Sequence, residues 1–269
     1  MTFPVIIRGG GDLASGVAMR LHRAGIRLMI AELDKPLAVR RTVSFAQAVF
    51  AGKIEIEGVN SQLIQSLDDA MESAAQGIIP VIVEPNLSTL TGLHPYVLID
   101  GRMTKREPET SLDTAPLVIG LGPGFIAGKN CHSVVETLRG HNLGRVFWEG
   151  SAAVDTGLPG SIVNYKVDRM LRAPTAGYLE TRAEIGQRLK TGDLIATLGG
   201  VEVRALCDGV LRGLIHPSVE LTQGMKIGDL DPRDDPSFCF RVSDKALAVG
   251  GGVLEAMLSQ PEIRRQLWT

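Results

Sequence analysis

The sequence predicts an α/β fold, built on a mostly parallel sheet, together with a smaller all-β segment. Across the first 165 residues, short apolar runs alternate with segments whose apolar residues recur at helical spacing, which is typical of strand–helix–strand units. From about residue 166, glycine turns separate short strand-like runs, and no helical pattern returns before residue 231. We therefore predict a Rossmann-like α/β domain over 1–165, an all-β domain over 166–230, and a helical segment over 231–269 that packs back on the α/β domain.

Each element of the predicted α/β domain follows from a local pattern. Continuous apolar runs indicate strands that are buried on both faces of a parallel sheet; these runs span 4–8, 27–32, 78–85, 94–101, 115–121 and 144–150. Helical spacing predicts helices from Leu13 to about Gly25 and over 44–52, 60–77 and 130–140. Ser44 is the predicted N-cap of the second helix, and Gly52 ends it. In the C-terminal segment, the glycines at 250–252 interrupt an apolar helical pattern, which indicates close packing on another element.

The first candidate binding site is the glycine-rich stretch "IRGGGDLASG" at 7–16, which joins a predicted strand to a predicted helix. It fits the dinucleotide-binding pattern G-x-G-x-x-A, and an acidic residue ends the next strand. The helix N-terminus would favour an anion, and the acidic residue could accept hydrogen bonds from a ribose. A carboxylate within the loop would repel a pyrophosphate, so a tight turn without a ligand stays open. The candidate cofactor-binding residues are Gly9, Gly10, Gly11, Asp12, Ala14 and Glu32.

A second glycine loop, "IGLGPGFIAG" at 119–128, follows another predicted strand and precedes the predicted helix 130–140. Gly120, Gly122 and Gly124 are its candidate cofactor-binding residues, although Pro123 lacks the N–H that a phosphate cradle would use. If both loops follow parallel strands of one sheet, both lie at its carboxyl edge, where ligands bind in open α/β folds.

Three residues after the second loop are weak catalytic candidates. Cys131 would gain thiolate character if it lay at a helix N-terminus, and His132 and Glu136 would share a helix face. Two ordinary interpretations compete with this one. Cys131 could be a buried, inert side chain, and Ser133 with Glu136 could form a capping box that leaves His132 outside the helix.

The predicted all-β segment contains an internal repeat of 32 residues. "RAPTAGYL" at 172–179 aligns with "RALCDGVL" at 204–211, and "LKTGDLI" at 189–195 aligns with "LTQGMKI" at 221–227. Two copies of one β-unit are expected to pack on each other. The repeat resembles the barrel-sandwich hybrid of lipoyl and biotinyl carrier domains. Those domains present a lysine between their repeats, whereas this chain has Gly199 and Gly200 there, so we expect no lipoyl or biotin group.

Composition narrows the function classes. The formal net charge is −2 and aromatic residues make up 4% of the chain, which argues against nucleic acid as a partner. Three widely spaced cysteines, Cys131, Cys207 and Cys239, fit a reducing compartment. No apolar run approaches 18 residues, and we recognise neither a signal peptide nor a metal-binding motif. We therefore expect a cytoplasmic protein with no metal site and no membrane partner.

Six phrases in order resemble the YqeB-type family of accessory proteins for selenium-dependent molybdenum hydroxylases. They are "RGGGDLASGVAMRLHRAG", "RRTVSFAQAV", "IDGRMTKR", "GLGPGFIAGKNCHSVVETLRGHNLGRV", "EGSAAVDTGLPG" and "KIGDLDPR". The resemblance as a whole runs from about residue 4 to 258. The resemblance implies a helper in the maturation of a molybdenum hydroxylase, with that client or its maturation proteins as partners. It supplies no catalytic residues.

The leading hypothesis is thus a maturation factor that binds a nucleotide or a nucleotide-bearing, molybdopterin-type cofactor at the glycine loops. An NAD(P)-dependent oxidoreductase is the first alternative, although the sequence lacks a Tyr-x-x-x-Lys pair and His132 is the only well-placed histidine. A non-catalytic scaffold that docks a partner through its β-domain is the second. Whether the protein is an enzyme, and whether it forms a homo-oligomer, stay open at this point.

Overall fold

The computed structural model describes residues 3–104, 107–154 and 169–268. The chain divides into two compact units, each of which is described by itself below. The first comprises Met1–Asp34, Phe45–Asp155 and Val242–Thr269, and the second comprises Lys35–Ser44 and Thr156–Arg241. The stretch predicted as one C-terminal segment, 231–269, is therefore divided between the two units at Arg241.

The first unit contains a nine-stranded sheet with the order β10-β9-β7-β6-β1-β2-β5-β4-β3. Its inner strands, from β9 to β4 in that order, run parallel, and β10 and β3 are antiparallel at the two edges. The strands are β1 (Val5–Arg8), β2 (Leu28–Glu32), β3 (Lys53–Ile56), β4 (Val59–Ile64), β5 (Ile79–Val83), β6 (Val97–Asp100), β7 (Leu117–Leu121), β9 (Ser133–Val135) and β10 (Val146–Phe147). The prediction of an α/β fold with a mostly parallel sheet is confirmed.

The chain changes direction in this sheet between β1 and β6. From β1 it moves outward to β2 and on to the edge strand β3, and it comes back through β4 and β5. It then crosses to the other side of β1 to form β6 and β7. Such a reversal opens a crevice outside the carboxyl ends of the two central strands, where α/β proteins commonly bind their ligands.

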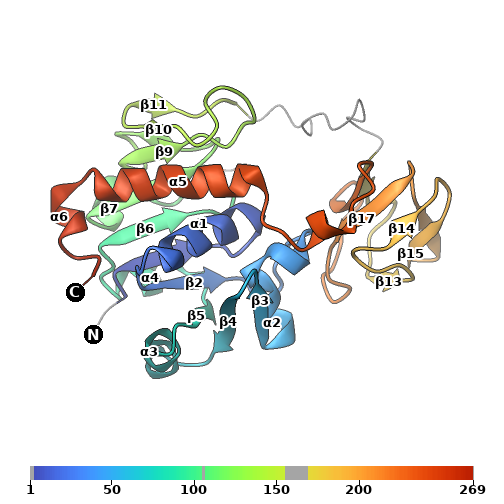
Figure 1. Ribbon diagram of the computed structural model, residues 1–269, viewed down its shortest axis with the longest axis horizontal. Coiled ribbons are helices and arrows are strands. Elements are labelled where there is room, and N and C mark those ends of the chain that lie inside the picture. Colours follow the sequence, from blue (N-terminus) through green and yellow to red (C-terminus); the bar gives the residue numbers. More distant parts are fainter. Residues whose placement is uncertain (1–2, 105–106, 155–168, 269) are drawn as a thin grey trace. The chain divides into compact units, whose positions relative to one another are not determined.

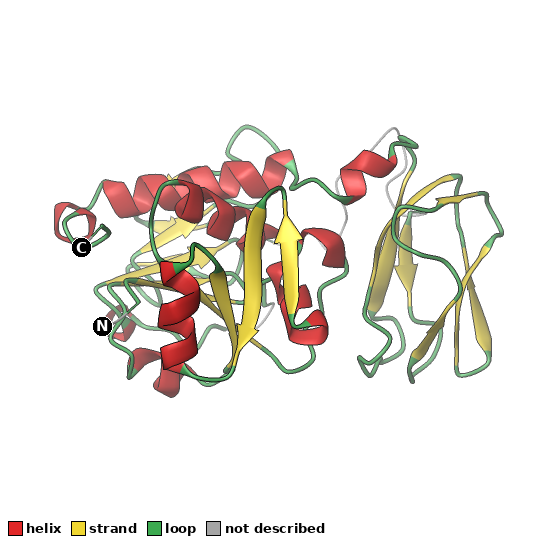
Figure 2. Ribbon diagram, turned by 60° about the horizontal axis from the view of Figure 1, so that its bottom comes forward, coloured by secondary structure: helices red, strands yellow, loops and turns green. Residues whose placement is uncertain are grey.

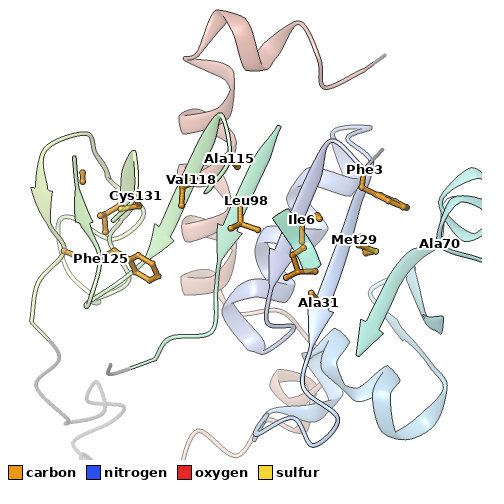
Figure 3. Packing of buried hydrophobic residues seen from close by; sticks show 14 of the residues in the cluster. Phe3, Ile6, Met29, Ala31, Ala70, Leu98, Ala115, Val118, Phe125 and Cys131 are labelled. Atoms are coloured by element: carbon orange, nitrogen blue, oxygen red, sulfur yellow. The ribbon is translucent and has the colours of Figure 1, made fainter. Parts of the chain in front are cut away.

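Helices and loops cover both faces of the sheet. One row of neighbouring side chains, Ile6, Met29, Leu98 and Val118, packs against Ala70 of α3 (Leu67–Ala75) and Leu90 of α4 (Leu87–Thr91). Figure 3 shows this layer, with Phe125 and Cys131 at the end beside Val118. A second pair of helices, α1 (Asp12–Arg23) and α5 (Asp244–Leu258), lies side by side along the sheet (Figure 1). The short helices are α2 (Ala48–Ala51) and α6 (Pro261–Arg264).

Glycines allow α1 and α5 to approach each other closely. A Cβ atom on Gly250 would lie 2.8 Å from the Gly16 carbonyl oxygen, and one on Gly16 would lie 2.6 Å from the Ala246 Cβ. Gly252 likewise faces the backbone of Gly144, whereas Gly251 faces open space. The close packing predicted for the triple glycine is thus confirmed at Gly250 and Gly252.

Three predicted helices differ from the structure. Residues 59–64 form β4, whose alternating burial fits an edge of the sheet, and only 67–75 are helical, behind a capping box at Ser66. Residues 133–135 form β9, because the branched side chains of Val134 and Val135 suit a strand beside β7. The predicted helix 44–52 contains only η2 (Phe45–Gln47) and α2, and Ser44 bonds the Arg40 carbonyl rather than capping a helix. Gly52 does end α2, with φ of 76°.

The second unit contains two antiparallel sheets (Figure 2). One has the order β12-β18-β17-β14 and the other has the order β13-β15-β16. The strands are β12 (Met170–Arg172), β13 (Leu179–Thr181), β14 (Arg188–Leu189), β15 (Leu194–Leu198), β16 (Val201–Arg204), β17 (Gly209–Leu214) and β18 (Lys226–Asp231). Small antiparallel sheets are thus confirmed for this part of the chain.

Strand pairing in the second unit follows the 32-residue repeat. Leu179 pairs with Leu198, and the residues 32 positions later, Leu211 and Leu230, pair in the same way. Leu189 of the first copy pairs with Gly209 of the second copy. The equivalent residues of the other copies, Leu221 of the second and Gly177 of the first, also form a bridge. The repeat in the sequence is therefore also a repeat in the pairing of the backbone.

Among the helices of the described residues, none combines the length and the apolar character of a membrane-spanning segment.

Candidate functional site

The carboxyl edge of the first unit carries the glycine loop that the sequence singled out. The loop follows β1 and leads into α1, whose N-cap is Gly11. Gly9 has φ of 90°, which favours glycine, and a Cβ on Gly10 would lie 2.8 Å from the Ala46 backbone nitrogen. A Cβ on Gly11 would meet nothing within 4 Å. Gly9 and Gly10 are therefore required by the fold, and Gly11 forms the open surface of the loop.

Ala14 allows α1 to lie close to the end of β6. It is fully buried in the first turn of α1, and a Cβ on Gly101 would lie 2.9 Å from the Ala14 Cβ. A larger residue at 14 would push α1 away from the strand that ends before Gly101. Asp12 begins α1 as its first residue and is the acidic residue of its first turn.

A buried ion pair lies directly at the reversal between β1 and β6. Arg8 and Asp100 are the last residues of these strands and neighbours in register, and both are buried. The Arg8 guanidinium also donates to Glu109 at 3.0 Å and to the Pro85 carbonyl at 3.1 Å. Arg102 binds the same Asp100 carboxylate through Nε at 3.0 Å and through NH2 at 2.7 Å.

This pairing changes the ionisation of the neighbouring groups. Burial opposes the charged form of Arg102, but the hydrogen bond and charge of Asp100 raise its pKa. The hydrogen bond from Arg8 lowers the pKa of the more exposed Glu109. Both groups are therefore held in their charged forms beside the glycine loop, since the Cα of Arg102 would lie 3.2 Å from a Cβ on Gly9.

The Glu32 side chain binds the backbone of the glycine loop, whereas the dinucleotide pattern predicts that it binds a ribose. Its Oε2 accepts the Gly10 N–H at 2.6 Å, and its Oε1 accepts the Leu33 N–H at 2.8 Å. Burial raises the pKa of Glu32, while these two N–H groups and the charge of Arg102 act in the opposite direction. A carboxylate of the protein itself therefore bonds an amide that was predicted to face a ligand.

The second glycine loop is not a strand–loop–helix unit, and that prediction is wrong. Gly120 lies within β7, and a Cβ there would overlap the ring of Phe125. Gly122 has φ of 73° and faces the Thr137 hydroxyl, and Gly124 has φ of 98°. At Gly120 and Gly122 these glycines make room for side chains of the protein, and β9 follows where a helix N-terminus was predicted.

The three weak catalytic candidates are parts of the structure around β9. Cys131 is fully buried beside Phe125, and burial raises its pKa to about 11, opposite to the lowering predicted at a helix N-terminus. The His132 ring accepts the Val118 N–H at Nδ1, 2.9 Å away, and burial lowers its pKa. The buried Glu136 carboxylate accepts the N–H groups of Leu138 at 2.7 Å and Ala153 at 2.8 Å.

Arg8 and Asp100 were not predicted as site residues. Their signal in the sequence is a charged residue that ends a continuous apolar run, in "VIIR" and in "VLID". Arg102 follows β6 in the phrase "IDGRMTKR", of which residues 105 and 106 lie outside the described residues. Among the residues that the structure does describe, no group of three or more His, Cys, Asp or Glu side chains is placed to hold a metal ion.

Comparison with solved structures gives only weak similarities. An aspartoacylase family protein from Mesorhizobium loti covers 84% of this chain and 83% of its own at 11% identity, with a TM-score of 0.27. A succinylglutamate desuccinylase/aspartoacylase from Rhodobacter sphaeroides matches 24% of this chain and 22% of its own at 19% identity, with a TM-score of 0.22. At these scores, neither similarity supports an inference about fold or activity.

No family model matches the chain. Comparison with curated proteins finds the uncharacterized protein YqeB of Escherichia coli (strain K12), which is 46% identical over 254 residues. The alignment covers 94% of this chain and 47% of that protein, so the chain spans about half the length of the relative it matches. The chain is thus a homologue of the E. coli protein YqeB.

Proposed function

We propose that this chain is an accessory protein for the maturation of a selenium-dependent molybdenum hydroxylase. In this proposal it binds a nucleotide, or a nucleotide-bearing molybdenum cofactor, at the carboxyl edge of the first unit. The client enzyme and the role in selenium chemistry rest on the resemblance of the six sequence phrases. The ligand site rests on the geometry of the glycine loop.

The observation that carries the ligand site is the open N-cap at Gly11. A helix of 12 residues begins there at the reversal of the strand order, and the cap position has no side chain and no neighbour within 4 Å of a Cβ. A helix N-terminus favours an anion through its N–H groups and its dipole. The strand order from β5 through β1 to β7 supports a Rossmann-like domain, and the pairing repeat of the second unit supports a barrel-sandwich hybrid.

Exposed apolar side chains near the loop suit the base of a nucleotide. Leu33 follows β2, and Val83 ends β5; they are 41% and 39% exposed. Val83 is the neighbour of Glu32 in register and Leu33 follows Glu32, so both apolar residues lie at the carboxyl edge of the sheet that also carries the glycine loop. A flat heteroaromatic base could cover them while its phosphate faced Gly11.

Replacement of Gly11 tests this ligand site. Gly11 has φ of −69° and open space around it, so Gly11→Ala and Gly11→Val should fold with little loss of stability. The added methyl groups would stand where a phosphate must approach the backbone, so we expect weaker binding of the nucleotide, by about tenfold or more for Val (roughly 1.4 kcal/mol). Calorimetric titration of NAD, NADP, ATP and CTP measures the effect, and native mass spectrometry of freshly purified protein identifies any retained ligand.

Three outcomes separate the alternatives. Binding of NAD or NADP with hydride transfer would instead favour an oxidoreductase. If the folded wild type retains no ligand and binds none of the four nucleotides, the ligand site is wrong, and a scaffold that docks its partner through the β-unit becomes the better description. The accessory role itself predicts that the hydroxylase from cells lacking this protein contains less selenium.

A further inference from the structure

Glu32 places a carboxylate on the loop amide that an anionic ligand would use. Its Oε2 lies 2.6 Å from the Gly10 nitrogen, and its Oε1 lies 2.8 Å from the Leu33 nitrogen. Because Glu32 is the last residue of β2, which pairs with β1 on one side and β5 on the other, the sheet fixes the position of this carboxylate. The Gly10 amide therefore already binds an anion of the protein.

The cations near Glu32 are already paired with other carboxylates, so they would not neutralise both Glu32 and a phosphate. Arg102, which follows β6, is the cation that acts on Glu32, and it is bound to Asp100 through two nitrogens. Arg8 on β1 is bound to Asp100 and Glu109. Three acidic residues of the first unit also lie at this edge: Asp12 at the start of α1, Asp34 after β2 and Glu84 after β5. A phosphate beside an ionised Glu32 would therefore meet like charge at short range.

We propose that binding of a phosphate group at the glycine loop is coupled to the uptake of one proton by Glu32. The proton comes from solvent and binds a carboxylate oxygen of Glu32. The resulting O–H group donates to a phosphate oxygen, and the Gly10 N–H is then shared with the ligand. When the ligand leaves, the proton returns to solvent. This inference rests on the proposed ligand site and specifies how that site accepts an anion.

Burial of the side chain supports this coupling. It already raises the pKa of Glu32 in the free protein, in spite of the two backbone N–H groups and Arg102. A nearby phosphate adds a like charge and raises that pKa further. A different role for Glu32, as the acceptor for ribose hydroxyls, requires the ionised carboxylate and has the opposite dependence on pH.

Titration with ADP, pyrophosphate and adenosine distinguishes these roles. Above about pH 7.5 the terminal phosphate of ADP is mostly ionised, so its own titration contributes little. Pyrophosphate still titrates at higher pH and is used only to detect binding at pH 7.5. Between pH 7.5 and 9, we expect the affinity of the wild type for ADP to fall by up to about tenfold per pH unit, as the uptake of one proton requires. Calorimetry at pH 7.5 in two buffers of different ionisation enthalpy should show about one proton taken up per ADP.

Glu32→Gln keeps the shape of the side chain and removes its charge. We expect this variant to bind ADP with the same affinity at pH 7.5 and at pH 9, without proton uptake, and more tightly than the wild type at pH 9. Glu84→Gln is the matched control, because Glu84 follows the neighbouring strand and its carboxylate accepts the Asn86 N–H rather than an N–H of the glycine loop. It should keep the pH dependence of the wild type.

The possible failures are distinguishable. If the wild type and Glu32→Gln both fail to bind ADP and pyrophosphate, the proposed phosphate site is wrong, and the inference is wrong with it. If ADP binds with an affinity that does not change with pH and without proton uptake, only the coupling is wrong. If Glu32→Gln loses affinity for adenosine and ADP alike, Glu32 is a ribose acceptor.

Discussion

The buried pair of Arg8 and Asp100 shows how single residues shape the carboxyl edge. An isolated charge at either position would be costly, because both side chains are at most 2% exposed. The cost is offset by hydrogen bonds to the Pro85 carbonyl, to Glu109 and from Arg102. Removing one partner would leave the other as an uncompensated buried charge. The pair therefore holds the ends of β1 and β6 in register on the two sides of the reversal.

Cys131 provides a prediction at the residue scale. Because it is fully buried and its pKa is raised to about 11, we expect it to resist alkylation in the folded protein at pH 8. Cys207 and Cys239 are also buried and serve as internal controls. Mass spectrometry after iodoacetamide treatment should show slow labelling of all three thiols, and rapid labelling in denaturant. If Cys131 is labelled selectively, and its labelling rate reaches half its maximum at a pH below the ordinary thiol pKa of about 8.5, Cys131 is again a candidate functional residue.

At the scale of elements, the contact of α1 with α5 depends on the placement of glycines within one turn. Gly250 faces the Gly16 carbonyl, whereas Gly251, the next residue of α5, faces open space. A side chain at Gly250 must displace backbone, which is costly in a packed interface. A side chain at Gly251 only restores helix propensity. Replacement by alanine should therefore lower the free energy of unfolding at Gly250 and raise it at Gly251.

We expect Gly250→Ala to lower the free energy of unfolding by about 1–3 kcal/mol. We expect Gly251→Ala to raise it by about 0.5–1 kcal/mol. Chemical denaturation followed by circular dichroism compares the two variants with the wild type. Equal effects of the two substitutions would mean that the helices do not meet through Gly250.

Elements also show what could be predicted from the sequence. The central strands and the loop at Gly9–Gly11 were predictable because a continuous apolar run followed by glycines is a strong local signal. Residues 60–64 and 133–135 were predicted as helical, because their apolar residues fit helical spacing by chance. Their pairing with β5 and β7 decides the structure, and partners distant in sequence leave no local signal. The hydrogen bond between Glu32 and Gly10 could not be predicted for the same reason, because it joins residues 22 positions apart.

At the scale of the whole molecule, the chain contributes two separate segments to the second unit. Residues 35–44 precede most of the first unit in sequence, yet they pack on the four-stranded sheet of the second. The buried Arg40 guanidinium donates to the carbonyls of Phe238 at 2.9 Å and Arg241 at 3.1 Å. Arg41 donates to the Leu214 carbonyl at 2.7 Å. The second unit is therefore complete only with the early segment in place.

This arrangement predicts a local effect of Arg40→Ala. The substitution leaves two carbonyls without their charged donor, which costs about 3 kcal/mol. We expect faster amide exchange in β17 and in residues 236–241, with unchanged exchange in β1, β2 and β6. Arg23→Ala is the control, because Arg23 makes exposed contacts with Glu57 within the first unit and should alter neither set. Hydrogen–deuterium exchange with mass spectrometry measures both units in one sample. If Arg40→Ala accelerates exchange equally in both, the two units unfold as one cooperative structure, and the early segment does not serve the second unit alone.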